Sequence, residues 1–355
     1  MVSKDKMKKL NVAVIGCSWM GRQHMAGVLE NDANLYAICD TAQSQIDERL
    51  KEFSPERTCT DYRELLDDPK VDIAIIVTPD YYHLEMTEAF LRAGKHVLCE
   101  KPMALTMEEC ERMIQVSKEC DKLLMVGQVC RCNPQFVKAK QLIDAGEIGE
   151  LYYVESEYAH DYGVARGFND WRVDARRHGF IGGGCHAVDL LRWIAGNPID
   201  VCAVGNKKNL TDWPIQDDTN VAIYNFPNGV IGKVFVSIGC KRNYTMRSCF
   251  YGTKGTIICT GQVDDSYIML YQNTNDTERK LTYHEGRDYN IGHRLGIAPK
   301  DHNVAGELKE LIESIETGKP LLTSPIDGAS SVAVCCASIE ASRTGERVVI
   351  KYPKA

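Results

Sequence analysis

Short apolar runs separated by amphipathic stretches fill the first third of the chain. The runs are rich in Val, Ile and Leu and predict buried strands, at residues 11–15, 35–39, 71–77, 96–99 and 123–127. The stretches between them have the apolar spacing of helices, as in residues 82–93, which end at Gly94. Strands that alternate with helices in this way predict an α/β fold with a parallel sheet.

The pattern changes from about residue 128 onwards. Strand-like runs now follow one another closely, at residues 151–158, 220–226, 230–238, 247–251, 256–260 and 267–271. The turn Pro227-Asn228-Gly229 joins two of them as a hairpin, and neighbouring strands of this kind predict an antiparallel sheet. We therefore expect two domains, a nucleotide-binding domain at 1–128 and an α+β domain at 129–355.

The junction between the first run and the first helix carries a glycine pattern typical of dinucleotide-binding folds. Gly16 permits a tight turn, Gly21 lets the helix approach the strand, and the helix start offers free N–H groups to a pyrophosphate. Asp40 follows the second run, 24 residues after Gly16, where a carboxylate grips ribose hydroxyls. The middle glycine of the usual pattern is Ser18, whose hydroxyl can donate to a phosphate. An ordinary strand-to-helix turn is the alternative interpretation.

The composition narrows the classes of function. Hydrophobic residues make up 44% of the 355 residues and charged residues 26%, as in ordinary soluble globular proteins. The net charge of −7 and the lack of a long basic run argue against nucleic-acid binding. No apolar run approaches the roughly 18 residues of a membrane span, and the basic start lacks a signal-peptide core. We expect a cytoplasmic protein without membrane contact.

Cysteine is unusually frequent, with 15 residues and no CxxC motif. A disulfide framework belongs to small secreted domains, so we interpret these residues as buried free thiols that pack as small hydrophobes. Metal binding by Cys130 and Cys132 is the alternative, and we expect no metal site.

Several motifs in a fixed order resemble those of one enzyme family. The most specific is Glu100-Lys101-Pro102 after the predicted strand 96–99, preceded by Thr78-Pro79-Asp80 and His83. Further motifs span nearly the whole chain: Val14-Ile15-Gly16, Met20-Gly21, Arg131-Cys132-Asn133-Pro134, Asp170-Trp171-Arg172, Gly184-Cys185-His186, Asp189 and Ser342-Arg343-Thr344-Gly345. Together they resemble the glucose–fructose oxidoreductase/inositol dehydrogenase (Gfo/Idh/MocA) family.

This resemblance implies a fold, an activity and partners. The fold is an N-terminal Rossmann domain with a doubly wound parallel sheet, followed by an α+β domain with a large open antiparallel sheet. The activity is NAD(P)-dependent oxidoreduction of sugars, inositols or related polyols. Family members commonly form oligomers through the sheet, so we expect a homo-oligomer, a dimer or a tetramer, whose second domain binds the substrate.

We expect NAD as the cofactor, because Asp40 repels a 2′-phosphate and residues 41–44 offer no cation to hold one. The turn and the family motifs together give the expected cofactor contacts: Gly16, Ser18, Trp19, Met20, Gly21, Asp40, Thr78, Pro79, His83, Glu100 and Lys101. A helix-cap role for His83 and a purely structural role for Glu100 are the alternatives.

The resemblance also implies a catalytic lysine together with an aspartate and a histidine four residues apart. Lys101 matches the lysine and His186 the histidine, but the position of the aspartate is Gly182. A desolvated lysine near a positively charged nicotinamide has a lowered pKa and can relay protons, so we expect Lys101 and His186 to be catalytic. The missing carboxylate has three candidate replacements: Asp161, Asp174 and Asp189.

A loop rich in aromatic and polar residues follows the predicted strand 151–158, and this composition suits carbohydrate recognition by stacking and hydrogen bonding. The residues expected to bind substrate are Lys101, Arg131, Tyr158, Asp161, Trp171, Arg172, His186 and Asp189. Three alternatives stay open: a subunit contact for the aromatic loop, a capping turn for Arg131 and a helix-dipole role for Asp189.

The sequence therefore favours an NAD-dependent dehydrogenase that moves a hydride between nicotinamide and a carbinol carbon of a sugar, inositol or polyol. Because Gly182 replaces the aspartate, a second hypothesis keeps NAD bound and uses transient oxidation for elimination, epimerisation or glycoside cleavage, as a lyase, epimerase or glycosidase. A third is a non-catalytic sugar-sensing protein that retains the fold, against which the intact Glu100-Lys101-Pro102 motif argues.

Overall fold

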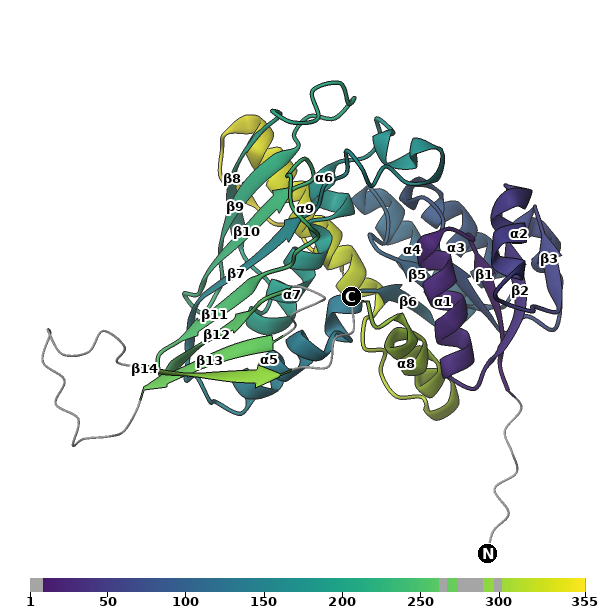
Figure 1. Cartoon of the computed structure of the whole chain (residues 1–355), viewed down its shortest axis with the longest axis horizontal. Coiled ribbons are helices and arrows are strands. Elements are labelled where there is room, and N and C mark those ends of the chain that lie inside the picture. The colour runs from purple at the N-terminus through teal and green to yellow at the C-terminus, as the bar shows by residue number, and fades with distance from the viewer. Residues whose placement is uncertain (1–8, 262–266, 274–289, 297–301, 355) are drawn as a thin grey trace, which may run out of the picture. The chain divides into compact units, whose positions relative to one another are not determined.

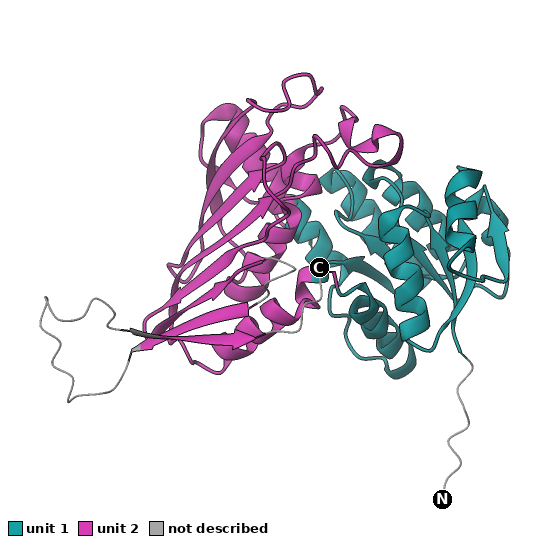
Figure 2. Cartoon of the chain, viewed as in Figure 1, with its two compact units in different colours: residues 1–129, 303–332, 353–355 teal, residues 130–302, 333–352 magenta. Residues whose placement is uncertain are grey.

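The computed structural model describes residues 9–261, 267–273, 290–296 and 302–354, and the chain forms two compact units. Unit 1 comprises residues 1–129, 303–332 and 353–355, and unit 2 comprises residues 130–302 and 333–352 (Figure 2). The chain leaves unit 1 close to the expected domain boundary at 128/129. It then returns to unit 1 for residues 303–332, which the sequence analysis placed in the second domain.

Unit 1 is built on a six-stranded parallel sheet with the order β3-β2-β1-β4-β5-β6 (Figure 1). The strands are β1 Asn11–Ile15, β2 Asn34–Cys39, β3 Arg57–Cys59, β4 Ile73–Ile76, β5 His96–Glu100 and β6 Leu124–Gly127. The strand order reverses between β1 and β4, and doubly wound sheets bind ligands beyond the carboxyl ends of the strands at such a point. The predicted Rossmann sheet is confirmed.

The helices of unit 1 pack in two pairs, α1 with α8 and α3 with α4. Their bounds are α1 Trp19–Glu30, α2 Gln43–Leu50, α3 His83–Arg92, α4 Met107–Cys120 and α8 Val304–Thr317, and short 3-10 turns lie at η1 Tyr62–Leu65 and η2 Asp80–Tyr82. α4 begins with a capping box, in which the Thr106 hydroxyl accepts the N–H of Glu109 and the Glu109 carboxylate accepts the N–H of Thr106. The sequence thus fixes the start of this helix locally.

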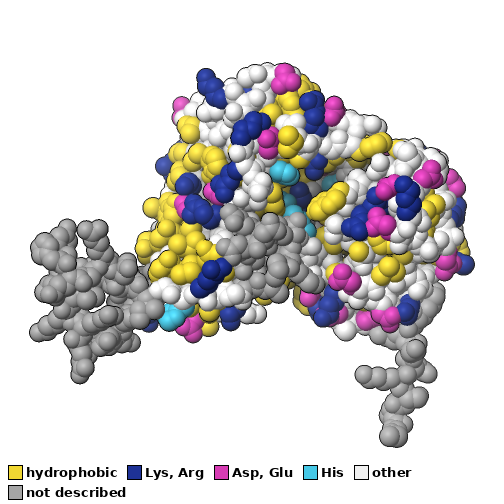
Figure 3. Space-filling view, in the orientation of Figure 1, with side chains coloured by type: hydrophobic (Ala, Val, Ile, Leu, Met, Phe, Trp, Pro, Cys, Tyr) yellow, Lys and Arg dark blue, Asp and Glu magenta, His cyan; other side chains and the backbone are white. Residues whose placement is uncertain are grey.

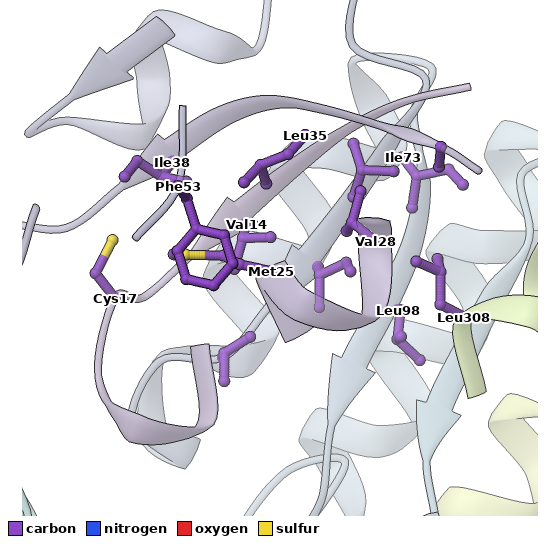
Figure 4. Packing of buried hydrophobic residues seen from close by; sticks show 14 of the residues in the cluster. Val14, Cys17, Met25, Val28, Leu35, Ile38, Phe53, Ile73, Leu98 and Leu308 are labelled. Carbon is purple, nitrogen blue, oxygen red and sulfur yellow. The ribbon is translucent and has the colours of Figure 1, made fainter. Parts of the chain in front are cut away.

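Apolar side chains from strands and helices form a core cluster in unit 1 (Figure 4). It contains Val14 and Leu35 of the sheet, Met25 and Val28 of α1, and Leu308 of α8, each at most 7% exposed. Burial of one such side chain stabilises the fold by about 1.5–3 kcal/mol. A helix from late in the sequence therefore completes a core that the first strands begin.

Unit 2 is built on a nine-stranded sheet with the order β14-β13-β12-β11-β7-β10-β9-β8-β15 (Figure 1). Its strands are β7 Leu151–Ala159, β8 Asp200–Asn206, β9 Thr219–Asn225, β10 Ile231–Ser237, β11 Ser248–Gly252, β12 Gly255–Cys259, β13 Tyr267–Asn273, β14 Asn290–Gly296 and β15 Val348–Val349. Neighbouring strands are antiparallel except β7 and β10, which are parallel. The large, mostly antiparallel sheet is confirmed, with a parallel pair inside it.

Helices cover one face of the unit 2 sheet. α7 packs on β7 and β10, and α5 packs on β12 and β13, on the same face (Figure 1). The helical segments of this part of the chain are η3 Val129–Arg131, α5 Pro134–Asp144, η4 Phe168–Val173, α6 Gly179–Gly182, α7 Cys185–Ala195 and α9 Pro325–Thr344. α9 begins in unit 1 and ends in unit 2.

The cysteines are free thiols and most of them are buried. Among the residues that the structure describes, no helix combines the length and the apolar character needed to cross a bilayer. Basic and acidic side chains are interspersed on the face shown in Figure 3.

Candidate active site

The turn between β1 and α1 leaves no room for a side chain at two glycines. Gly16 has a φ of +110°, and a Cβ atom there would lie 2.6 Å from the carbonyl oxygen of Val77. A Cβ atom on Gly21 would lie 2.0 Å from the carbonyl oxygen of Gly16. Trp19 and Met20 begin α1 between them, with the Trp19 side chain exposed. Both glycine positions therefore shape a backbone cradle at the start of a helix, where phosphates bind.

Asp40 holds the glycine turn in place. Its Oδ2 accepts the N–H of Cys17 at 2.8 Å, and its Oδ1 accepts the N–H of Ala42 at 2.9 Å. Each carboxylate oxygen has a further lone pair, so Asp40 can also accept ribose hydroxyls. Ser18 is the N-cap of α1 but makes no capping hydrogen bond, so the helix does not engage its hydroxyl. The turn, the helix start and Asp40 together fit a dinucleotide.

His83, the first residue of α3, joins the loops that follow β4 and β5. Its Nδ1 donates to the carbonyl oxygen of Pro102 at 2.8 Å, and its Nε2 donates to that of Thr78 at 3.1 Å. Two carbonyl acceptors require a proton on both ring nitrogens, so the imidazole is positively charged. Burial opposes this charge, but Cys99, Asp80 and the Pro102 carbonyl outweigh burial and raise the pKa of His83 to about 9. A buried cation thus connects the Thr78-Pro79 loop to the Glu100-Lys101-Pro102 loop.

Lys101 lies directly beyond the carboxyl end of β5. Its N–H donates to Oε2 of Glu100 at 3.0 Å, Oε1 of Glu100 lies 2.9 Å from Nε2 of His24, and the Lys101–Pro102 peptide bond is cis. Burial opposes ionisation of Glu100, but the hydrogen bond with His24 and the charge of Lys101 outweigh it and lower the pKa of Glu100. Glu100 is therefore an ionised, buried carboxylate bonded to the backbone of the candidate catalytic lysine.

The glycines before α7 allow a tyrosine of β7 to pack against the start of the helix. A Cβ atom on Gly183 would lie 2.2 Å from Cε1 of Tyr158. The His186 ring stacks on the same tyrosine, with centroids 5.8 Å apart and an angle of 18° between the planes. Sγ of Cys130 lies 3.8 Å from Nδ1 of His186, whose side chain is buried. Tyr158 therefore fixes the plane of the candidate catalytic histidine.

Tyr158 and His186 belong to a group of rings in unit 2 that we call the aromatic cluster: Tyr158, His160, Tyr162, His186, Tyr244 and His302. The Tyr158 hydroxyl lies 3.0 Å from that of Tyr162 and 3.3 Å from Nδ1 of His160. Burial and the neighbouring Tyr162 and Tyr244 raise the pKa of Tyr158 well above its usual range, so its hydroxyl stays neutral. Sequence reasoning missed Tyr244 and assigned no role to His302, because neither stands in a motif or a periodic element.

Arg172 and Trp171 extend the aromatic cluster from η4. The Arg172 guanidinium lies 5.2 Å from the ring centroid of Tyr162 and 4.7 Å from that of Trp171. Asn169 and Asp170 have φ values of +53° and +55°, a left-handed conformation that non-glycine residues adopt at a cost. The segment that carries Trp171 and Arg172 is thus held in an unfavourable backbone conformation.

Asp189 forms a buried ion pair with Arg131. Its Oδ2 accepts from Nε of Arg131 and its Oδ1 from Nη2, both at 2.9 Å, and Asp189 is 0% exposed. Arg192 lies 3.5 Å from the same carboxylate. This buried bidentate pair orients Arg131, and the expected contact of Asp189 with a substrate hydroxyl stays a prediction.

The other two candidate carboxylates also bind basic side chains. Asp161 accepts Nζ of Lys241 at 3.1 Å, and Asp174 accepts Nη2 of Arg176 at 2.7 Å. The hydrogen bond from Arg176 lowers the pKa of Asp174 to about 2. Both carboxylates are therefore already engaged by a basic side chain.

An arginine occupies the space beside Gly182, where the resemblance implies an aspartate. A Cβ atom on Gly182 would lie 2.5 Å from Nη2 of Arg177. The Arg177 guanidinium is buried and lies 4.3 Å from the ring centroid of Trp171. The site thus has a cation at the position where its expected carboxylate is missing.

Two family models match the chain in succession. Residues 10–128 match the Gfo/Idh/MocA oxidoreductase family with its NAD-binding Rossmann fold, and residues 136–258 match the Gfo/Idh/MocA C-terminal domain. The chain belongs to the Gfo/Idh/MocA oxidoreductase family. The motif around Lys101 lies in the first matched segment and His186 in the second.

Relatives within the Gfo/Idh/MocA family act on inositols and sugars, as their names state. The chain is 27% identical to myo-inositol 2-dehydrogenase from Thermotoga maritima over 90% of this chain and 92% of that protein. It is 25% identical to levoglucosan dehydrogenase from Pseudarthrobacter phenanthrenivorans over 95% of this chain and 97% of that protein. A solved levoglucosan dehydrogenase in complex with NADH and levoglucosan shares the fold, with a TM-score of 0.82 at 22% identity over 97% of this chain and 100% of that chain.

Proposed function

We propose that this Gfo/Idh/MocA protein is an NAD-dependent oxidoreductase that acts on a carbinol carbon of a sugar, inositol or related polyol. One observation carries the proposal. In the parallel sheet of unit 1, the glycine turn follows β1 and Lys101 follows β5, so both lie at the same edge of the sheet. A dinucleotide cradle and a candidate acid/base group therefore share one edge.

The proposed role of each group follows from its chemistry. NAD, when bound, supplies the hydride acceptor. Nζ of Lys101 accepts the proton of the substrate hydroxyl, while Glu100 holds the lysine through its backbone N–H. We infer that His186 acts with Lys101 on this proton.

The aromatic cluster and its extension give the proposed substrate contacts. Rings such as Tyr158 and Trp171 offer flat faces to a sugar ring, and the Arg172 guanidinium donates hydrogen bonds to hydroxyls. Asp189 supports this surface indirectly by orienting Arg131. Relatives that act on inositol and levoglucosan support cyclic polyols as the substrate class.

A substrate panel tests the proposed function. The protein is incubated with NAD and inositols, levoglucosan or hexoses while NADH absorbance is recorded. We expect NADH in a one-to-one ratio to oxidised product for at least one compound, and a loss of most of this activity in Lys101→Ala. Full activity of Lys101→Ala on the identified substrate would show that the site is assigned wrongly.

Arg177 beside Gly182 favours a second candidate, in which NAD stays bound and oxidation is transient. A ketone formed at one carbon makes the adjacent C–H acidic, and a nearby guanidinium stabilises the negative charge that develops there. Elimination, epimerisation or glycoside cleavage would follow. Turnover that exceeds net NADH, with solvent deuterium entering the product beside the oxidised carbon, would support this candidate; stoichiometric NADH without deuterium would eliminate it.

We further propose that the protein is a homo-oligomer that assembles through the open face of the unit 2 sheet. Val204, Ile223 and Ile231 are 68%, 41% and 46% exposed. Ile223 is paired with Lys233, and Ile231 lies two residues from Lys233 on β10, so Ile223 and Ile231 point to the same face. Ile223 is also paired with Cys202, and Val204 lies two residues from Cys202 on β8, so Val204 shares that face. Exposed apolar side chains that share a face are typical of an interface between proteins.

A further inference from the structure

Three ionisable side chains meet in the interior of unit 1: His24 of α1, Glu100 of β5 and Glu307 of α8. We call them the buried trio. Each has a ligand-capable atom within 4.8 Å of the other two, and they are 1%, 7% and 1% exposed, respectively. Glu307 lies beside β6, where a Cβ atom on Gly127 would be 3.5 Å from its Oε1. Glu100, the last residue of β5, directly precedes Lys101, so the buried trio adjoins the candidate catalytic lysine.

The two carboxylates of the buried trio differ in their hydrogen bonds. Glu100 bonds through Oε1 to His24 and through Oε2 to the N–H of Lys101. Both oxygens of Glu307 are buried and have no hydrogen-bond partner among the described residues. A negative charge on Glu307 would be removed from bulk solvent and would have no donor among the described residues to stabilise it.

The charged groups around Glu307 also disfavour a negative charge on it. His24 faces it from α1, Glu100 and Lys101 face it from the end of β5, and β6 presents only the uncharged Leu124–Gly127. Burial raises the pKa of Glu307 well above its usual range, the charge of Glu100 raises it further, and Lys101 opposes both. Burial and the nearby negative charge of Glu100 therefore both favour the protonated form of Glu307.

We propose that Glu307 is a positioning residue for Lys101: it carries a proton, and it thereby keeps one negative charge rather than two beside the lysine. This proposal rests on the proposed role of Lys101 as the proton acceptor. A second negative charge would stabilise the protonated lysine and prevent it from accepting a proton at neutral pH. The neutral carboxyl group also keeps a polar group within 4.8 Å of the Glu100 carboxylate that holds the Lys101 backbone.

Three variants test the proposal. Glu307→Gln is neutral at every pH and keeps a polar group of similar size, and Glu307→Leu is neutral and apolar. Glu316→Gln removes a charge from the exposed face of the same helix. The protonated carboxyl group is followed directly by its carbonyl stretch in infrared spectra recorded in H2O and D2O. The metal content of the purified protein is measured by mass spectrometry.

We expect the infrared band of a protonated carboxyl group in the wild type and in Glu316→Gln, and its loss in Glu307→Gln. Glu307→Gln should keep kcat within about twofold and leave the pH profile of kcat/KM unshifted at neutral pH. Glu307→Leu should lower kcat on the order of tenfold with little change in KM, so that glutamine rescues what leucine loses. Thermal unfolding of Glu307→Gln and Glu307→Leu shows whether each variant keeps the fold. The infrared comparison can be made even on a variant that has lost its enzymatic activity.

Three results would overturn the proposal. If the band is absent from the wild type, or if Glu307→Gln moves the lysine-dependent limb of the profile down by on the order of one pH unit, Glu307 is ionised in the working protein. A stoichiometric divalent cation would show that the buried trio is a metal site instead. If the band behaves as expected but no polyol is oxidised, the proposed function fails while the proton on Glu307 stands.

Discussion

At the scale of single residues, one carboxylate connects the architecture of the turn to the choice of cofactor. Asp40 ties the glycine turn to the start of α2 through the N–H groups of Cys17 and Ala42. The same carboxylate carries the charge that we propose to exclude a 2′-phosphate. A substitution that tests the charge must therefore keep an acceptor for the turn.

Asp40→Asn removes the charge and keeps one oxygen acceptor. A phosphate about 4 Å from the wild-type carboxylate is repelled by roughly 1–4 kcal/mol, so we expect the wild type to bind NAD more tightly than NADP. Asp40→Asn should narrow that difference, mostly through tighter binding of NADP. Fluorescence titration of both cofactors measures it, and NADP binding as tight as NAD binding in the wild type would refute the prediction.

His83 gives the protein a pH-dependent stability. Its pKa is about 9 in the folded protein and about 6.5 when unfolded, so the folded state binds its proton more tightly. The proton bound by His83 contributes on the order of 3 kcal/mol to the free energy of unfolding. This contribution is fully present below pH 6.5 and is lost as the pH rises through 9. We expect His83→Gln to lack this slope between pH 6.5 and 9, as measured by denaturant unfolding. The exposed His293→Gln is the control and should keep the slope.

Lys101 and His186 should act as one catalytic unit. Lys101→Ala is expected to lower the rate on the order of 10²–10⁴-fold with NAD affinity nearly unchanged, the usual size of a general acid–base contribution. His186→Ala should cost a comparable factor, and the double variant much less than the product of the two. Steady-state kinetics on the identified substrate measure these factors, with the exposed Lys118→Ala as the control. Multiplicative losses in the double variant would show that the two residues act independently.

At the scale of elements, a buried ion pair fastens Arg131 to α7. Asp189→Asn leaves the buried guanidinium without its counter-charge, which typically costs about 3–5 kcal/mol of stability. We expect a loss of this size in denaturant unfolding, with little change of KM for the substrate in the folded fraction. Asp161→Asn is the matched control, because its partner Lys241 is exposed and such pairs contribute about 0–1 kcal/mol. A raised KM without a loss of stability would support Asp189 as a substrate contact.

Local patterns predicted most of the elements but not all of their pairings. The buried strands of unit 1 show as apolar runs, whereas β3 Arg57–Cys59 is too short to show a period. β14 Asn290–Gly296 contains two glycines and was missed for lack of alternation. The parallel pairing of β7 with β10 depends on segments far apart in sequence, which hairpin signals do not report.

Local patterns likewise predicted some residues of the candidate site but not others. The glycine turn, Asp40 and Lys101 stand in recognisable motifs. Their position at one edge of the sheet could therefore be predicted from the order of the strands and helices. Glu307 stands in an amphipathic helix, where a glutamate ordinarily faces solvent. Its position four residues before the buried Leu311 was the available signal that it faces inward.

At the scale of the whole molecule, the exposed apolar side chains of the unit 2 sheet predict a specific effect on assembly. Ile223→Glu places a charge in the proposed interface and should shift the oligomer towards monomer, because an unpaired buried charge is costly. Size-exclusion chromatography with light scattering measures the mass. Leu29→Glu, on the exposed surface of α1, is the control and should leave the mass unchanged. A monomeric wild type would contradict the assembly proposal.

The return of residues 303–332 to unit 1 sets the order in which the chain can mature on the ribosome. The first unit begins to be synthesised first, yet Leu308 and Leu311 of its core and Glu307 of the buried trio emerge only after the entire sheet of unit 2 except β15. Until then the nascent Rossmann sheet keeps an apolar surface uncovered, which makes it a site for chaperone binding or aggregation during synthesis.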